Sequence, residues 1–193
     1  MQTISAESLF ATQLTLGETP LWHPSEHRLY WVDIDAGHLY RSNPDMAGYE
    51  RYPFKTSLGA YCFRAEGGFI LASGEGFLVW DLDQETPAPL WNPLPADRPE
   101  VRLNDGKVDP AGRFYAGSMD VDQVKAELYR IDPDGSQHTV LQNVGISNGL
   151  GWSPDRKKMY YIDSLRATVY KLDYDLATGE LTNQQPLIIF VED

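Results

Sequence analysis

The chain is built from an internal repeat, which limits the folds open to it more than any other feature of the sequence. Turns rich in proline or glycine sit at positions 24, 66, 110 and 154, at offsets of 42, 44 and 44 residues (66 − 24, 110 − 66 and 154 − 110). A run of aromatic and β-branched residues follows each turn. Regular periods of about 40–50 residues are typical of propellers and solenoids. The sequence therefore predicts four copies of one structural unit.

Each unit has the pattern of a small β-sheet. Short runs rich in Tyr, Trp, Val and Ile are separated by Gly, Pro, Asp and Asn, and no stretch keeps the apolar period of a helix. A four-stranded sheet per unit predicts an all-β chain of propeller blades; the alternative, an all-β sandwich, does not require this repeat length. The expected strands are 18–22, 29–33 and 39–41; 61–63, 69–73 and 77–80; 104–108, 114–117 and 128–132; and 148–152, 159–163, 169–173 and 187–191.

The units are expected to form one domain. With 193 residues, 42% of them hydrophobic, the chain is long enough for a single domain with a substantial core. A proline-rich stretch, 87–99, lies between the second and third units. We interpret this stretch as a surface connection, so that residues 1–193 make a single propeller domain.

Three of the four units place an oxygen-bearing side chain at the same point of the repeat. Glu18, Asn104 and Asn148 each lie six residues before a turn proline (24 − 18, 110 − 104 and 154 − 148), and the second unit has Ala60 in this position. Equivalent positions of a ring face its axis, and a carboxylate with two amide oxygens makes a site for a hard cation. The alternative is that the two asparagines only form turns and that Glu18 is a surface charge.

Neighbouring polar residues are interpreted from strand alternation. Arg102 lies two residues before Asn104 and is expected on the same face, whereas Asp105 and Lys107 are expected on the opposite face. A guanidinium at the channel mouth suits polar or anionic oxygens of a substrate. Four aspartates that follow aromatic runs are interpreted as turn caps or as contacts between blades: Asp33, Asp132, Asp163 and Asp173.

Composition and charge argue against several classes of function. The net charge of −12 disfavours nucleic-acid binding, which needs clustered Lys and Arg, and is compatible with a bound cation. No apolar run approaches the roughly 18 residues that cross a bilayer. Met1–Phe10 lacks the basic start and apolar stretch of a signal peptide, and Cys62 is the only cysteine. We therefore expect a cytoplasmic protein without nucleic-acid or membrane partners.

Longer motifs occur in order at residues 16–22 (LGETPLW), 102–109 (RLNDGKVD), 112–119 (GRFYAGSM), 146–152 (ISNGLGW) and 160–164 (YYIDS). Through them the chain resembles the SMP-30/gluconolactonase family, which includes regucalcin-like sugar lactonases. The resemblance covers essentially the whole chain. It implies a β-propeller of the six-bladed type with one divalent cation in its channel. The activity it implies is hydrolysis of a sugar lactone, such as gluconolactone, to the aldonic acid.

The resemblance also implies roles for particular residues. Glu18 and Asn148 match metal ligands of the family, and Arg102 and Asn104 match residues beside the substrate. Glu127 corresponds, across a shortened spacing, to a glutamate that contacts the substrate. The expected cofactor is one divalent cation: oxygen ligands favour calcium, magnesium or manganese, and zinc tolerates such sites.

One part of the family pattern has no match. The remaining metal ligand, which is also the candidate general base, is an aspartate of the following blade in the family, and no such motif follows Asp163. Six blades would need about 240–270 residues. We therefore expect an incomplete propeller with about four blades, a catalytic base beyond Asp193, and impaired activity of the 193-residue chain.

A non-enzymatic role is the alternative, either as a calcium-binding propeller without turnover or as a protein-interaction propeller. Residues 29–33 (LYWVD) look like the repeats of receptor propellers, which bind proteins over the blade face. Glu18 distinguishes a lactonase from a protein-interaction scaffold, because a scaffold does not need oxygen side chains in register on its axis.

Overall fold

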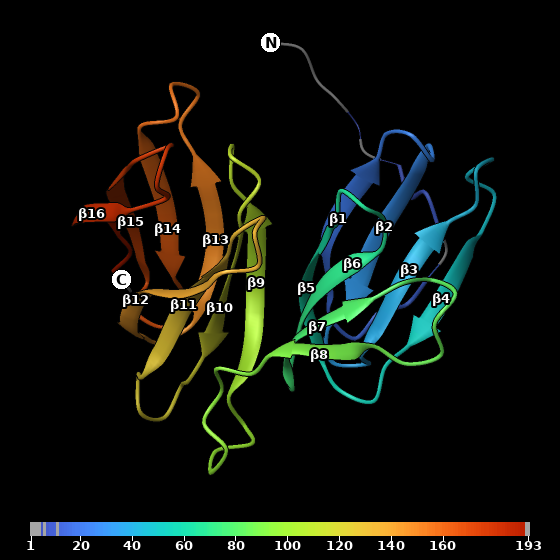
Figure 1. Ribbon diagram of the computed structural model, residues 1–193, viewed down its shortest axis with the longest axis horizontal. Helices are drawn as coiled ribbons and strands as arrows, with labels where there is room; N and C mark the ends of the chain where they lie inside the picture. Colours follow the sequence, from blue (N-terminus) through green and yellow to red (C-terminus); the bar gives the residue numbers. More distant parts are fainter. Residues whose placement is uncertain (1–4, 6, 11, 192–193) are drawn as a thin grey trace.

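The computed structural model describes residues 5, 7–10 and 12–191, and these residues form β-structure without any helix. Sixteen strands make four four-stranded antiparallel sheets. In each sheet, strands consecutive in sequence are neighbours in space, so each repeat forms one sheet (Figure 1). The prediction of an all-β chain with a small sheet per repeat is confirmed. None of the described segments is a helix able to cross a membrane.

The four sheets, called blades one to four, follow one another along the chain. Blade one contains β1 (Gly17–His23), β2 (Arg28–Asp33), β3 (His38–Ser42) and β4 (Tyr49–Pro53). Blade two contains β5 (Leu58–Phe63), β6 (Phe69–Ser73), β7 (Gly76–Trp80) and β8 (Ala88–Trp91). Blade three contains β9 (Arg102–Val108), β10 (Phe114–Met119), β11 (Ala126–Ile131) and β12 (Gln137–Val144). Blade four contains β13 (Ser147–Trp152), β14 (Lys158–Asp163), β15 (Thr168–Tyr174) and β16 (Leu181–Ile189).

The outermost strands are the elements that the sequence pattern did not predict well. No strand was expected at β4, β8 or β12, and β16 begins earlier than the predicted 187–191. The interpretation of 87–99 as a connection is wrong in part, because β8 lies within it. Pro89 is tolerated there because β8 is an edge strand, where one side of the backbone has no ladder partner.

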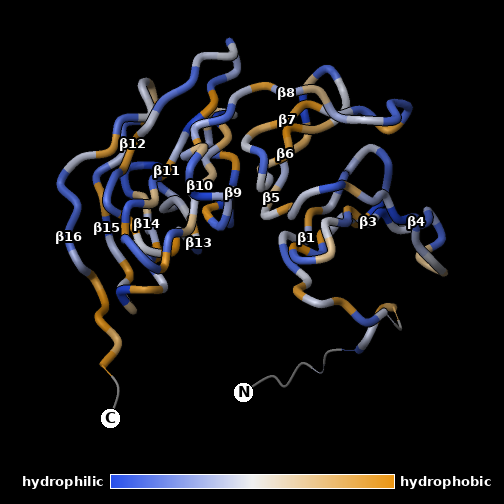
Figure 2. The backbone as a smooth tube through the Cα atoms, turned by 90° about the horizontal axis from the view of Figure 1, so that it is seen from below, coloured by the Kyte–Doolittle hydropathy of each residue, from blue (hydrophilic) through white to orange (hydrophobic). Residues whose placement is uncertain are grey.

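The sheets stand side by side along an arc, with the first strand of each sheet at the centre (Figures 1 and 2). β5 lies beside β1 and β9, and β9 lies beside β5 and β13. Two glycines permit this close approach. A Cβ atom on Gly59 would lie 2.4 Å from the carbonyl oxygen of Asn104, and one on Gly117 would lie 1.9 Å from Oγ of Ser147. This radial order, with inner strands around an axis, is that of a β-propeller.

The apolar core is divided among the interfaces between consecutive sheets. Three buried clusters fill the three interfaces. In β10, Phe114 and Ala116 pack toward blade two, whereas Tyr115 packs toward blade four. Successive strand residues point to opposite faces, and both faces of this sheet are covered, which is why five of the six residues of β10 are buried.

Each inner strand contains one extra residue relative to its neighbour. In β9, Leu103 pairs with Ser118 and Gly106 pairs with Ala116, so two residues stand opposite one. The same kind of register shift occurs in the first half of β1, β5 and β13. Such a bulge redirects side chains and interrupts the regular alternation of faces. Because the bulge lies in the first half of every inner strand, the redirected side chains lie at the same end of the central channel.

Two of the four singled-out aspartates fix the entry into an inner strand. The carboxylate of Asp33 accepts the backbone N–H groups of Thr15 and Leu16, at 2.8 and 3.0 Å, just before β1. The carboxylate of Asp163 accepts the N–H groups of the two residues before β13, at 2.9 and 3.1 Å. Their predicted capping role is confirmed.

Asp132 and Asp173 behave differently from the other two. Asp132 forms an ion pair with Arg130 at 2.6 Å, and Asp173 forms one with Lys158. In each case both partners belong to the same blade. The interpretation of these two residues as turn caps or contacts between blades is therefore wrong, because each binds a basic side chain of its own sheet instead.

A buried polar network joins blades three and four. Nη1 of Arg113 donates to Oδ2 of Asp109 at 3.0 Å, and the hydroxyl of Tyr174 donates to the same oxygen at 2.7 Å. Nη2 of Arg113 donates to the carbonyl oxygens of Leu176 and Ala177, in the loop between β15 and β16, at 3.1 and 2.6 Å. The side chains of Asp109 and Arg113 are 0% and 9% exposed. This network anchors the outer hairpin of blade four to blade three.

The outer edge of blade four is apolar and open to solvent. The side chains of residues 187–191 are exposed, and this end of the chain is orange in Figure 2. The outer strand of blade one, β4, instead carries Glu50 and Arg51. The two edges therefore present very different surfaces.

We expect Arg113→Leu to destabilise the protein strongly, because it leaves the buried carboxylate of Asp109 without its cation. Removing one partner of a buried ion pair costs about 3–5 kcal/mol. Urea denaturation followed by tryptophan fluorescence measures the loss. The control is Lys158→Met, which removes the cation of a more exposed pair and is expected to leave the midpoint nearly unchanged. Equal losses in the two variants would contradict the importance of the network.

The contribution of Asp33 to stability is expected to depend on pH. Burial opposes its ionisation, but the hydrogen bonds from backbone N–H groups outweigh burial, so the pKa of Asp33 lies below its usual value. Such a group stabilises the fold above its unfolded-state pKa of about 3.9, and this contribution is lost as the pH falls through the lowered value. We expect Asp33→Asn to cost about 1–3 kcal/mol at neutral pH, and less below about pH 4. Denaturation at stepwise lower pH tests this; a pH-independent difference would contradict it.

Candidate functional site

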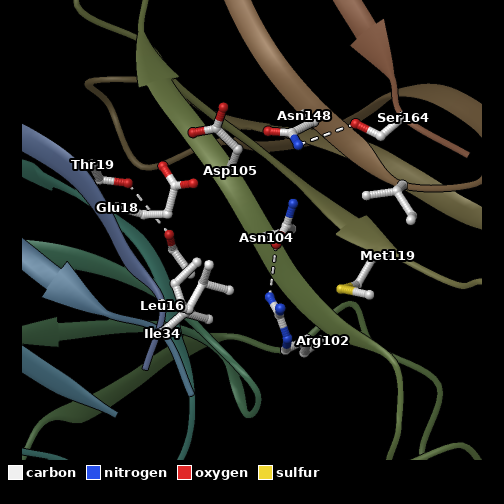
Figure 3. Close-up of a pocket in the computed structure, with 12 residues that line it drawn as sticks. Leu16, Glu18, Thr19, Ile34, Arg102, Asn104, Asp105, Met119, Asn148 and Ser164 are labelled. Carbon is white, nitrogen blue, oxygen red and sulfur yellow. Dashed lines mark hydrogen bonds between the residues drawn. The ribbon is translucent and has the colours of Figure 1, made fainter. Parts of the chain in front are cut away.

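A pocket of about 280 Å³ lies at the centre of the molecule, where the bulged ends of β1, β9 and β13 meet (Figure 3). All three strands contribute polar side chains, and the turn after β14 contributes one more. Apolar side chains line the rest of the pocket. The lining residues are Leu16, Glu18, Thr19, Ile34, Gly59, Arg102, Asn104, Asp105, Met119, Ile146, Asn148 and Ser164.

The structure brings together four of the five residues that the sequence singled out. Glu18, Arg102, Asn104 and Asn148 line this one pocket, although they come from blades one, three and four. Blade two contributes only Gly59, whose position has no side chain. The expected asymmetry, in which one blade supplies no oxygen-bearing side chain, is therefore present.

Glu127 is not brought into the pocket. It lies on β11, and its Oε1 accepts a hydrogen bond from Nε2 of Gln142 on β12 at 2.8 Å. It lines a separate groove together with Arg98 and Lys125. The order of the strands explains this position. β11 is the third strand of its sheet counted from the central axis, so β9 and β10 lie between it and the axis.

Asn104 is held in one orientation by partners on both sides. Its Nδ2 donates to the carbonyl oxygen of Ser147 on β13 at 2.8 Å. Its Oδ1 accepts from Nη1 of Arg102 at 2.8 Å, as Figure 3 shows. Asn104 is only 9% exposed, so both contacts are shielded from water. The amide therefore links blade three to blade four and presents its oxygen to the guanidinium.

The guanidinium of Arg102 has more N–H donors than its two hydrogen bonds within the protein use. Its Nη1 also donates to the carbonyl oxygen of Leu103 at 3.1 Å, and no carboxylate of the described residues lies within ion-pair distance of it. Burial lowers the pKa of Arg102 below its usual value, while the charge of Asp35 acts in the opposite direction. A guanidinium has five N–H donors, so several remain available to a ligand in the pocket.

Asn148 points its amide oxygen toward the two carboxylates of the pocket. Its Nδ2 donates to Oγ of Ser164 at 3.1 Å, and this contact keeps the amide nitrogen on the side of Ser164 and the amide oxygen on the other side. Figure 3 shows the oxygen on the side of Asp105 and Glu18. The Oδ1 atom also accepts the N–H of Gly149 at 3.1 Å. Oxygen atoms from three strands thus lie around the same space.

Asp105 corrects an expectation from the sequence, since it lies in the pocket and not on the opposite face from Asn104. The bulge explains the difference. Because two residues of β9 stand opposite one residue of β10, Asn104 and Asp105 no longer point to opposite faces. Lys107, beyond the bulge, is exposed. A glycine within a strand often marks a bulge, so Gly106 was the available signal.

The carboxylate of Asp105 lies in an unfavourable electrostatic environment. Burial raises the pKa of Asp105 above its usual value, and the negative charge of Glu18 acts in the same direction. The hydrogen bond from the N–H of Gly106, at 2.7 Å, and the charge of Lys107 act against this rise. Two carboxylates that face each other in a half-buried pocket favour a bound cation over an empty site.

The donor set fits a hard divalent cation. Two carboxylates and the amide oxygen of Asn148 face the same space (Figure 3), and calcium, magnesium and manganese prefer such oxygen ligands. Among the described residues, no group of three or more His, Cys, Asp or Glu side chains is arranged to hold a metal ion. An ion at this place would therefore need the amide oxygen, and further oxygens from water or a ligand, in addition to the two carboxylates.

Comparison with known proteins agrees with the fold and the motifs. A model of the SMP-30/Gluconolactonase/LRE-like region matches residues 16–193. Regucalcin of Xenopus laevis is 35% identical over 200 residues, which cover 100% of this chain and 67% of that protein. Pentonolactonase XacC of Haloferax volcanii is 38% identical over 180 residues, which cover 92% of this chain and 60% of that protein.

The fold is also found among solved structures. The luciferin-regenerating enzyme superposes with a TM-score of 0.83 at 31% identity, covering 93% of this chain and 62% of that chain. This chain thus spans roughly three-fifths to two-thirds of the length of these relatives. The resemblance inferred from the motifs is confirmed, including the relationship to lactone hydrolases. The chain belongs to the SMP-30/gluconolactonase/LRE-like family.

Proposed function

We propose that this protein hydrolyses a sugar lactone, such as gluconolactone, to the aldonic acid, with one divalent cation bound in the central pocket. The observation that carries the proposal is that Glu18 and Asn148 direct oxygen atoms into one pocket beside the guanidinium of Arg102. The similarity to a pentonolactonase supports a lactone as the substrate. The negative net charge of −12 is compatible with a bound cation.

Glu18 and Asn148 are the residues we assign to the cation. A cation bound there supplies Lewis acidity, which polarises the lactone carbonyl and lowers the pKa of a bound water. Ser164 keeps the amide nitrogen of Asn148 turned away from the carboxylates, so that the oxygen faces the pocket. Calcium, magnesium, manganese and zinc are the candidate ions.

Arg102 and Asn104 are the residues we assign to the sugar. The free N–H groups of Arg102 suit lactone and hydroxyl oxygens, and they suit the carboxylate of the product even better. The contact of Asn104 with the carbonyl of Ser147 keeps its amide fixed before the substrate arrives. In the reaction, water adds to the lactone carbonyl carbon, the ring C–O bond breaks, and a proton passes from the water to the ring oxygen. Fixed donors reduce the entropy cost of orienting the lactone for this step.

We also propose that the four blades belong to a propeller of the six-bladed type. The support is the arc of four radial sheets, which superposes on 62% of the luciferin-regenerating enzyme. If each blade takes about 40–45 residues, four of six blades make up about two-thirds of a ring, which is close to this coverage. A solved structure of the whole ring would test this arrangement.

Glu18→Gln is expected to abolish most of the cation binding, because it removes a charged ligand while keeping the shape of the side chain. Outer-shell changes at metal sites typically cost about 10- to 100-fold in affinity, so we expect a loss of at least about 100-fold for a direct ligand. Titration of Mn²⁺, with free Mn²⁺ followed by electron paramagnetic resonance, measures it. Glu85→Gln, at an exposed glutamate outside the pocket, is the matched control. Equal affinity of the Glu18 variant and wild type would refute the site.

Arg102→Met is expected to weaken turnover of gluconolactone in the presence of the cation. A hydrogen bond from a charged donor contributes about 1.5–3 kcal/mol, which corresponds to about 10- to 150-fold in kcat/KM. The change is expected mainly in KM if Arg102 binds the lactone equally strongly in the ground state and in the transition state. Alkali titration of lactone opening, with and without chelator, measures it. Arg156→Met, at an exposed turn, is the control. Cation binding without any chelator-sensitive turnover would support the calcium-binding alternative instead.

A further inference from the structure

Thr19 has a backbone conformation that its residue type disfavours. Its φ is +49°, in the left-handed region, where a β-branched residue is a genuine outlier. Pro20 follows it, and a residue before proline prefers extended conformations. Of the eight described non-glycine residues with a positive φ, Thr19 is the one that lines the central pocket. The strained backbone and the candidate site therefore coincide.

The internal repeat shows which residue type suits this position. Glu18 and Asn148 occupy the same point of the repeat, so Thr19 corresponds to Gly149, whose φ is +42°. Both residues lie in the bulge of an inner strand. Glycine adopts this conformation at no steric cost. Blade one has a threonine where blade four has glycine, and an outlier of this kind beside a pocket indicates a function for the side chain.

The hydroxyl of Thr19 is only weakly engaged within the protein. Its Oγ1 donates to the carbonyl oxygen of Gly59 at 3.4 Å (Figure 3), whereas O–H···O hydrogen bonds are usually about 2.7–2.8 Å long. A contact of this length contributes little to holding blade one against blade two. The hydroxyl oxygen also has two acceptor lone pairs, and none of the described residues donates a hydrogen bond to them.

An acceptor on the blade-one side of the pocket complements the donors of blade three. Arg102 offers only N–H donors, and both ends of the Asn104 amide already have partners. A sugar hydroxyl group donates as well as accepts, so each one needs an acceptor for its proton. The carboxylate of Glu18 is assigned to the cation. Thr19 therefore supplies an uncharged acceptor that is separate from the oxygen atoms assigned to the cation.

We propose that Thr19 determines specificity for hydroxylated lactones: its Oγ1 accepts a hydrogen bond from a hydroxyl group of the sugar lactone, while its own proton stays on the carbonyl oxygen of Gly59. This inference rests on the proposed function, since it concerns the same substrate. A site that binds a substrate hydroxyl group discriminates against analogues that lack it. Thr19 thus selects among lactones and does not hold the cation.

The test measures kcat and KM for gluconolactone and for δ-valerolactone, which has the same six-membered ring without hydroxyl groups. Thr19→Val removes the hydroxyl and keeps the branched shape. We expect it to lower the ratio of kcat/KM for gluconolactone to that for δ-valerolactone by about 3- to 10-fold, mainly through KM, because a neutral hydrogen bond is lost. Thr19→Ser keeps the hydroxyl and is expected to stay within about twofold of wild type. Thr139→Val, at an exposed position of β12, is the matched control.

Two further measurements separate this role from a structural role and from cation binding. Thr19→Gly relieves the backbone strain, so we expect its midpoint of urea unfolding to be no lower than that of wild type. Its preference for gluconolactone over δ-valerolactone is nevertheless expected to fall as in Thr19→Val. The affinity for Mn²⁺ is expected to be unchanged in both variants, because neither substitution touches Glu18 or Asn148.

An unchanged preference for gluconolactone in Thr19→Val would overturn the proposal. A urea midpoint of Thr19→Gly below that of wild type would contradict it, since the side chain would then be needed for the fold. Weaker Mn²⁺ binding by Thr19→Val would assign the hydroxyl to the cation instead. Each of these results leaves the proposed function intact. If the wild-type protein shows no chelator-sensitive turnover of gluconolactone, both proposals fail.

Discussion

The close approach of inner strands from different sheets is the constraint on which the rest of the molecule depends. Gly59 leaves room for backbone atoms of Leu103 and Asn104 in the next blade, and Gly117 leaves room for the side chain of Ser147. Only with this spacing can the amide of Asn104 reach the carbonyl of Ser147 across the interface. The aromatic interfaces farther out hold the sheets at the matching angle. The centre is thus assembled through close approaches at glycine, and the periphery through the packing of apolar side chains.

Much of the fold could be predicted from the sequence because the repeat and the strand pattern are both strong. Most residues of β2 and β10, and every second residue of β14, are buried between sheets, so the composition of these strands is constrained. The outermost strands face solvent on one side and have little such constraint. That is why β4 and β12 carry no clear pattern, and why β8 could lie inside a proline-rich stretch.

The candidate site could be predicted only where its residues obey regular geometry. Glu18, Asn104 and Asn148 were found because the spacing to the turn is the same in three repeats, and the structure brings all three to one pocket. Asp105 was misplaced because strict alternation fails at a bulge. Glu127 was assigned by resemblance across a shortened loop, and no periodicity could place it. The roles assigned to these residues in binding the cation and the substrate stay predictions, and so does the assignment of residues 1–193 to a single domain.

The uncharged outer edge of blade four, formed by β16, has a consequence for the behaviour of the protein in solution. From Leu181 to Val191 the sequence has no charged residue, and β16 has a strand partner on one side only. An uncharged edge strand with open backbone groups is a template to which another strand adds. The net charge of −12 holds molecules apart over a distance set by ionic strength. Added salt screens that repulsion but does not weaken strand addition at the edge. Low ionic strength therefore favours separate molecules, and high ionic strength favours self-association.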